Sequence, residues 1–319
     1  MKFYTNIQLI GNQFLIRGYE NGQHVTHREE WKPTLFVPSR KKTKYKTLEG
    51  ESVEPIQPGF VRDCREFYKK YDEVENFKIY GNDRYVYQYI SEKYPQDRIE
   101  FDIKKIKLVT IDIEVAAEQG FPDVENVAEE LLLISLQDYA TKKVTTFGSR
   151  PFVNKDPNVT YILCRDEVHL LSSFLAYWRK NLPEVITGWN SQMYDIPYLA
   201  GRINRVMGEK SMKDLSPWGL VSQGEVYISG RKNITYDIGG VTQLDYLDLY
   251  KRFTYTNQES YRLDYIANYE LGEKKLDHNE YDTFREFYTK DWDKFVRYNI
   301  KDVQLVDRLE DKLKLIELA

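Results

Sequence analysis

The stretch that decides the fold is Lys107-Leu-Val-Thr-Ile-Asp-Ile-Glu-Val115. It is rich in β-branched and aliphatic residues, so it predicts a buried β-strand. Side chains two residues apart on a strand point to the same face. We therefore expect Asp112 and Glu114 to lie side by side on one face, while the isoleucines between them point into the core from the other.

The residues that follow predict an α/β domain. Three strands are expected in succession, and helices and strands then alternate, which is typical of a mixed sheet covered by helices. A hairpin is expected around Gly230-Arg231-Lys232, and residues 244–250 form another buried element. The predicted strands are 130–139, 143–147, 160–163 and 185–189, and the predicted helices are 167–180, 196–206, 261–269 and 292–318.

The residues before 107 predict a small α+β domain. We place the boundary so that residues 1–106 form an amino-terminal domain and residues 107–319 form the α/β domain. The basic run 40–46 holds five cations and one tyrosine, which can contact phosphates. A solvated loop or a lysine-protected edge strand is the favoured alternative. Strands are expected at 3–9, 12–19, 23–31 and 34–37, and helices at 61–71 and 85–93.

Composition limits the classes of function. The chain has 319 residues, enough for about two domains at roughly 150 residues each. No run of about 18 apolar residues occurs, which excludes a membrane-spanning helix, and the first residues lack a signal peptide's layout. Two cysteines in unrelated contexts indicate no disulfide framework and fit a reducing cytoplasm. The net charge of −4 argues against a non-specific nucleic-acid binder, but not against an enzyme that binds DNA locally.

The paired carboxylates of Asp112 and Glu114 are the first candidate site. Two adjacent carboxylates repel each other unless a cation lies between them. Hard oxygen ligands suit Mg²⁺ or Mn²⁺. Taken alone, the pair is better interpreted as a solvated strand face. Asp195 opens a helix after a buried strand, where it is either an N-cap or a site carboxylate at the carboxyl end of the sheet.

A third candidate segment is Tyr298-Asn-Ile-Lys-Asp302 in the last predicted helix. Tyr298 and Asp302 are four residues apart, so they share one face of the helix. A buried Asp302 needs a partner or a metal. The alternative is a surface ion pair between Asp302 and Lys301 or Arg308.

In combination these segments indicate a metal-dependent nuclease. Four acids occur in an order and on elements that allow them to converge, as in the DEDD exonucleases: Asp112, Glu114, Asp195 and Asp302. Tyr298 lies four residues before the last acid, whereas the other subclass needs a histidine where Arg297 stands. The prediction is therefore the tyrosine-type 3′→5′ exonuclease.

With these residues the sequence resembles the T-even phage branch of family B DNA polymerases. The resemblance covers nearly the whole chain and is strongest at 111–115, 187–197, 244–250 and 256–261. It implies that residues 107–319 form an RNase H-like exonuclease domain. It also implies that the protein acts in the host cytoplasm if it is phage-encoded. It also implies that residues 1–106 form the family's amino-terminal domain, which in some relatives binds RNA. The residues that the resemblance places against DNA are Phe121, Asn190, Arg231 and Lys275, with Phe121 stacking on the unpaired 3′ base.

The mechanism implied is hydrolysis of the 3′-terminal phosphodiester by two Mg²⁺ or Mn²⁺ ions. Asp112 is expected to bridge both ions, Glu114 and Asp302 to complete the first site, and Asp195 to hold the second ion through water. Tyr298, with an ordinary pKa near 10, is expected to orient the attacking water rather than to deprotonate it. The substrate is a single-stranded or frayed DNA 3′ end, and the products are 5′-monophosphates.

The family's two polymerase palm motifs do not occur in this sequence. We therefore expect that the chain does not synthesise DNA unaided and acts with a palm-bearing polymerase portion. Three alternatives stay open at this point: a non-catalytic nucleic-acid-binding or assembly subunit of a split polymerase, a repressor that binds RNA through residues 1–106, and a stand-alone DEDD nuclease.

Overall fold

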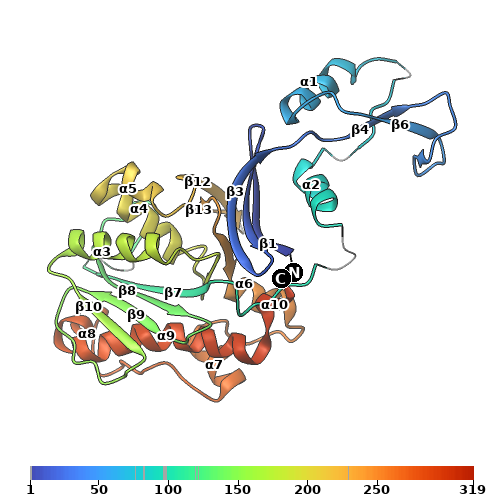
Figure 1. The fold of residues 1–319 in the computed structure, drawn as a ribbon. Coiled ribbons are helices and arrows are strands. Elements are labelled where there is room, and N and C mark those ends of the chain that lie inside the picture. Colours follow the sequence, from blue (N-terminus) through green and yellow to red (C-terminus); the bar gives the residue numbers. More distant parts are fainter. Residues whose placement is uncertain are drawn as a thin grey trace. The chain divides into compact units, whose positions relative to one another are not determined.

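The computed structural model describes residues 2–75, 77–81, 83–95, 99–118, 120, 122–228 and 230–319. The chain divides into two compact units, Met1–Phe101 and Asp102–Ala319 (Figure 1). This division lies five residues before the boundary predicted from the sequence. Among the described residues, no helix has both the length and the apolar character needed to cross a membrane.

In the described part of the first unit, there are two small antiparallel sheets and two helices. One sheet has the order β1-β2-β3 and the other the order β4-β6-β5. Apolar and aromatic side chains from both helices and from β2 form the core, where Phe14 stacks on Tyr89 with 4.5 Å between ring centroids. The elements are β1 (Lys2–Ile10), β2 (Gln13–Glu20), β3 (Gln23–Glu30), β4 (Leu35–Pro38), β5 (Tyr45–Lys46), β6 (Ser52–Ile56), α1 (Val61–Tyr71) and α2 (Tyr85–Lys93).

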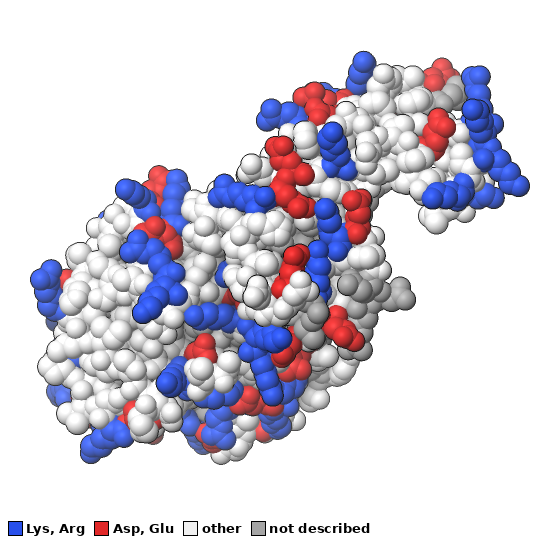
Figure 2. All heavy atoms as spheres, viewed as in Figure 1, with Lys and Arg blue, Asp and Glu red and all other residues white. Residues whose placement is uncertain are grey.

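The basic run 40–46 lies at the β4–β6 end of this unit. Its five cations are exposed, and Figure 2 shows Lys and Arg side chains gathered there. The run ends in β5, which is an edge strand of its sheet. The run is therefore an exposed loop that leads into a lysine-flanked edge strand.

The second unit is built on a six-stranded mixed sheet with the order β10-β9-β8-β7-β11-β14. Strands β7, β8 and β9 are antiparallel neighbours, whereas β10 runs parallel to β9, and β11 runs parallel to both β7 and β14. The predicted mixed α/β architecture is confirmed. The strands are β7 (Leu108–Val115), β8 (Leu131–Asp138), β9 (Val144–Gly148), β10 (Val159–Leu163), β11 (Val185–Gly188) and β14 (Thr242–Asp245).

Helices cover both faces of this sheet (Figure 1). On one face, α3 and α4 bury residues such as Phe174 and Ile203 against Ile111 and Ile113 of β7. On the other face, α8 and α9 bury Phe295 and their neighbours against β8 and β9. These layers fix the central strand from both sides. The helices are α3 (Glu167–Lys180), α4 (Asp195–Met207), α5 (Glu209–Lys213), α6 (Tyr246–Phe253), α7 (Leu263–Leu271), α8 (Phe284–Lys290), α9 (Trp292–Leu313) and α10 (Leu315–Leu318).

The second unit differs locally from the sequence prediction. The helix predicted at 292–318 is interrupted at Lys314, whose φ of 55° is left-handed. The buried element at 244–250 is the end of β14 followed by α6, because the Asp245 carboxylate caps that helix by accepting from Leu247 N–H at 2.9 Å. The hairpin is longer than predicted and consists of β12 (Val221–Ile228) and β13 (Arg231–Ile238).

Candidate active site

The central strand β7 supplies the first two carboxylates. It lies between β8 and β11, so its register is fixed on both sides. Ile111 and Ile113 are buried in the layer beneath α3 and α4. Asp112 and Glu114 therefore project from the opposite face, on which α9 packs. The alternation predicted for this strand is confirmed.

Asp302 comes to the same place from α9. This helix is anchored by Phe295, Val296 and Val303, which are fully buried against the sheet. Carboxylate oxygens of Asp112, Glu114 and Asp302 all lie within 4.8 Å of one another. The structure therefore brings these three predicted acids into one group.

Asp195 lies beside this group rather than in it. It is the first residue of α4 and is buried. Its Oδ1 accepts a hydrogen bond from the backbone N–H of Ile113 at 3.0 Å, and Ile113 lies between the two acids of β7. Its negative charge raises the pKa of Asp112, after burial and the charge of Asp302. Asp195 thus contacts the strand that carries the site while staying outside the three-residue group.

The pKa values of all four acids are raised, and burial is the largest cause for each. Burial raises the pKa of Asp195 to about 7 and that of Asp302 to about 6. The neighbouring acids raise the pKa of Glu114 further, while Lys275 and a hydrogen bond from Asn299 lower it. The fold therefore concentrates negative charge that solvent does not compensate.

Lys275 is the cation inside this group of acids. Its Nζ forms an ion pair with the Asp302 carboxylate and donates to the Tyr298 hydroxyl at 2.9 Å. Its backbone N–H donates to the Asp264 carboxylate at 2.8 Å, which holds the segment in place. Burial raises the pKa of Tyr298 above its usual range, so its hydroxyl stays protonated at neutral pH. Tyr298 and Lys275 thus lie at the carboxylates.

Two further residues shape the site and were not identified from the sequence. Asn299 is fully buried, and its Nδ2 donates to Asp112 Oδ2 at 2.6 Å. Asp245 accepts from the backbone N–H groups of Asn190 at 3.1 Å and Gln192 at 2.9 Å, which fixes the turn before Asp195. A usable signal existed for Asn299 alone, because it lies three residues before Asp302 and so shares its helix face.

For the other described residues predicted to contact DNA, the structure gives a position in the chain and an exposure but no contact with the carboxylates. Asn190 is exposed and has a left-handed φ of 67°, a conformation that Asn tolerates better than most residues. Arg231 begins β13 beside the hairpin turn, and its side chain is exposed. Phe121 lies outside the described residues.

The donor set fits a hard divalent cation. Asp302 Oδ1 is buried and has no hydrogen-bond partner among the residues that the structure describes. An unpaired buried carboxylate oxygen is costly unless a cation completes its surroundings. Three carboxylates that converge within ligand distance supply the oxygen atoms that Mg²⁺ and Mn²⁺ prefer. The group could hold a metal ion.

Comparison with known proteins then decides the family. Residues 69–266 match the family described as DNA polymerase family B, exonuclease domain. The chain belongs to this family. The DNA-directed DNA polymerase of Escherichia phage RB69 is 30% identical over 349 aligned residues, which cover 100% of this chain and 38% of the relative. The corresponding polymerase of Enterobacteria phage T4 is 28% identical over 345 residues, with the same coverage.

The family B exonuclease match covers only part of the site, whereas the phage alignments cover all of it. The family match ends at residue 266, so Lys275, Tyr298 and Asp302 lie beyond it. The alignments with both phage polymerases span the whole chain and include these residues. The DNA polymerase of Bombyx mori nuclear polyhedrosis virus is 28% identical over 166 residues, or 51% of this chain. The chain spans less than two fifths of the length of the two phage relatives.

Proposed function

We propose that this chain is the 3′→5′ proofreading exonuclease portion of a DNA polymerase and that it is of the tyrosine type. Its substrate would be the 3′ end of single-stranded or frayed DNA, and its products 5′-monophosphates. The observation that carries the proposal is the buried convergence of Asp112, Glu114 and Asp302. Tyr298 and Lys275, which touch each other beside this group, supply the other polar atoms that the reaction needs.

The proposed cofactor is a pair of Mg²⁺ or Mn²⁺ ions. Asp112, Glu114 and Asp302 would hold them, with Asp195 as an outer ligand through water. When bound, such ions make hydroxide available near neutral pH and stabilise the leaving 3′ oxygen. The raised pKa values of the four acids support this role, because a divalent cation is the partner that keeps such carboxylates ionised.

The chain's own residues would orient the reactants. Tyr298 accepts a hydrogen bond from Lys275, so its own proton is free to be donated to the attacking water. Because the pKa of Tyr298 is raised by burial, the hydroxyl positions the water and does not remove a proton from it. Lys275 would also balance the charge of the scissile phosphate. Asn299 would hold the Asp112 carboxylate in its ligating orientation.

Selectivity would come from the need for an unpaired terminal nucleotide. A mismatch lowers the cost of unpairing, so a site of this kind acts preferentially on errors.

We propose Phe121, Asn190 and Arg231 as DNA contacts, with residues 107–319 as the exonuclease domain and residues 1–106 as the amino-terminal domain. A palm-bearing polymerase portion is the proposed partner, and RNA is a second ligand proposed for residues 1–106.

The test is digestion of a 5′-labelled single-stranded oligonucleotide in Mg²⁺, with a chelator as the control. We expect Asp112→Ala to lower the rate at least about a thousandfold, because it removes a ligand on which both ions depend. Asp248→Asn, an exposed acid in α6, serves as the matched control and should digest at the parent's rate. Equal rates for Asp112→Ala and the parent would contradict the proposal. A parent with no Mg²⁺-dependent digestion would instead favour the non-catalytic subunit.

A further inference from the structure

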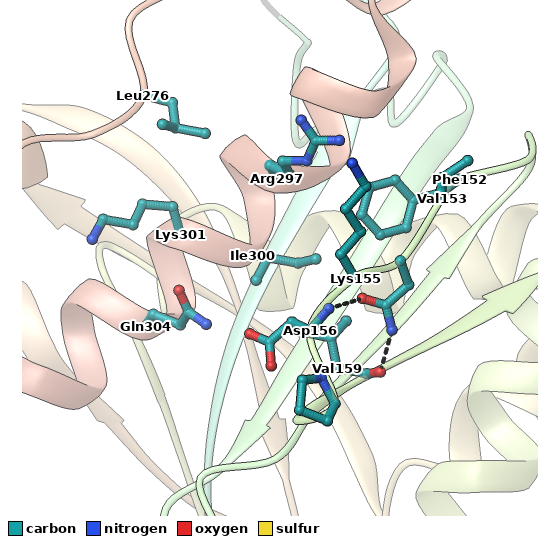
Figure 3. A pocket seen from close by; sticks show the side chains of 12 residues that line it. Phe152, Val153, Lys155, Asp156, Val159, Leu276, Arg297, Ile300, Lys301 and Gln304 are labelled. Carbon is teal, nitrogen blue, oxygen red and sulfur yellow. Dashed lines mark hydrogen bonds between the residues drawn. The ribbon is translucent and has the colours of Figure 1, made fainter.

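A pocket of about 510 Å³ lies against one face of α9 (Figure 3). Its α9 residues, Arg297, Ile300, Lys301 and Gln304, repeat every three or four positions and so form one helix face. The facing wall is the 152–159 segment between β9 and β10. The volume is within the range of about 300–1,000 Å³ that is typical of small-molecule sites.

The pocket combines an apolar floor with a cationic rim. Phe152 is half-buried, and Ile300 and Val159 are buried, so the floor that they form is apolar. The cations that line the pocket are Lys155, Arg297 and Lys301, against the single carboxylate of Asp156. Such a surface favours a ligand that has both a flat apolar part and negative charge.

Two of the three cations are available to a ligand. Lys155 is exposed and forms no hydrogen bond or ion pair with any residue that the structure describes. Arg297 is half-exposed, lies 3.5 Å from the Asp293 carboxylate and has its Cζ 5.8 Å from the Phe152 ring centroid. Lys301 is held by Glu273 at 2.7 Å and contributes less. Figure 3 shows the charged ends of Lys155 and Arg297 on the Phe152 side of the pocket.

The wall of the pocket is ordered by its own hydrogen bonds. Asn154 Nδ2 donates to the Val159 carbonyl at 2.6 Å, and its Oδ1 accepts from the Asp156 N–H at 2.9 Å (Figure 3). The Tyr161 hydroxyl also donates to the Arg150 carbonyl at the start of this segment, at 2.5 Å. A wall that is already fixed loses little conformational entropy when a ligand binds.

We propose that this pocket binds a nucleotide unit of single-stranded DNA outside the active site. The base would pack against the apolar floor that Phe152, Val159 and Ile300 form, and the adjoining phosphate would contact Lys155 and Arg297. Leu276 lines the pocket and directly follows Lys275, whose ammonium lies at the carboxylates. The pocket and the carboxylate group therefore adjoin across this short segment. The inference rests on the proposed function only in taking single-stranded DNA as the substrate.

Binding is tested without hydrolysis, in chelator, by the fluorescence anisotropy of a short labelled oligothymidylate. We expect the double variant Lys155→Glu/Arg297→Glu to raise the Kd about tenfold. We also expect it to flatten the dependence of log Kd on log salt concentration by about 0.7 or more, since the contact with one phosphate is lost. Lys180→Glu reverses an exposed lysine at the end of α3, on the opposite face of the sheet, and should change the Kd less than about twofold. Thermal melts should agree for all variants.

The position of the base is tested with an oligonucleotide that carries 5-iodouracil, which crosslinks to nearby aromatic side chains. A crosslink at Phe152 that disappears in the double variant supports the proposal. An unchanged Kd and an unchanged salt slope in the double variant overturn the proposal. The proposal is also overturned if the double variant loses binding of free thymidine monophosphate but binds the oligonucleotide as the parent does. A parent that fails to digest DNA, while the double variant still binds it more weakly, would refute the proposed function and leave this site intact.

Discussion

The substitution Asp195→Asn should stabilise the metal-free protein at alkaline pH. Burial raises the pKa of Asp195 to about 7 from an ordinary value of 3.8. A raised pKa in the folded state means that the folded protein binds a proton more tightly than the unfolded chain does. The stability that this proton contributes is fully present below about pH 4 and is lost as the pH rises through about 7. Asn keeps the shape and an acceptor for the Ile113 N–H, and it removes the charge.

The magnitude follows from the difference between the two pKa values. Near pH 8 the ionised Asp195 costs at most about 4 kcal/mol of folding free energy, and near pH 4 well under about 1 kcal/mol. The acids titrate together, so part of this cost is shared among them. We therefore expect Asp195→Asn to raise the free energy of unfolding by about 2–4 kcal/mol near pH 8 in chelator.

The assay is urea unfolding of the parent and the variant in chelator, at about pH 4, 6 and 8. The gain should grow with pH and should shrink when Mg²⁺ is added, because the ion stabilises the parent more than the variant. Asp248→Asn, the exposed control, should change stability by less than about 0.5 kcal/mol at every pH. A variant less stable than the parent near pH 8 would refute the view that these acids strain the metal-free fold.

Three further substitutions test individual contacts. Tyr298→Phe should lower kcat about a hundredfold with little change in KM, because it removes only the proton that orients the water; an unchanged kcat would exclude that role. Asn299→Ala should raise the Mg²⁺ concentration needed for half-maximal activity by at least about tenfold, because the Asp112 carboxylate loses its 2.6 Å donor; an unchanged Mg²⁺ titration would contradict this. Arg202→Ala should lower the free energy of unfolding by about 3–5 kcal/mol in urea titrations, because the largely buried Glu167 carboxylate loses two hydrogen bonds of 2.7 Å and its cation. A loss below about 1 kcal/mol would show that Glu167 finds another partner.

The parts of the fold that the sequence predicted well are those fixed by local periodicity. The helix at 167–180 has apolar residues at helical spacing and a capping Asp166, which accepts from His169 N–H at 2.7 Å. Its predicted bounds agree with α3, and those of 61–71 agree with α1. The helix α8 was not predicted, because its buried residues, Phe287 and Tyr288, are adjacent and form no repeating stripe.

In the candidate site, too, the residues that local spacing relates could be predicted, whereas contacts between residues far apart in the sequence could not. The spacing of Asp112 and Glu114 needs only the two-residue repeat of a strand, and the spacing of Tyr298 and Asp302 needs only the helical repeat. The hydrogen bond from Asn299 to Asp112 joins residues 187 positions apart, and the bond from Asn190 to Asp245 joins residues 55 apart. No spacing rule reaches across such distances, so these supporting contacts required the structure.

The long helix α9 explains why a carboxylate group and a cationic pocket can lie so close together without cancelling each other. Tyr298 and Asp302 face the sheet, whereas Arg297 and Lys301, each one residue earlier, lie roughly a quarter turn away along the helix surface. Fully buried residues such as Val303 fill the space beneath the helix and exclude water between the two faces. The cations on both sides of α9 also have acidic partners of their own: Lys275 pairs with Asp302, Arg297 with Asp293 and Lys301 with Glu273. A substitution that tilts α9, rather than one that removes a charge, is therefore the change that would disturb both sites together.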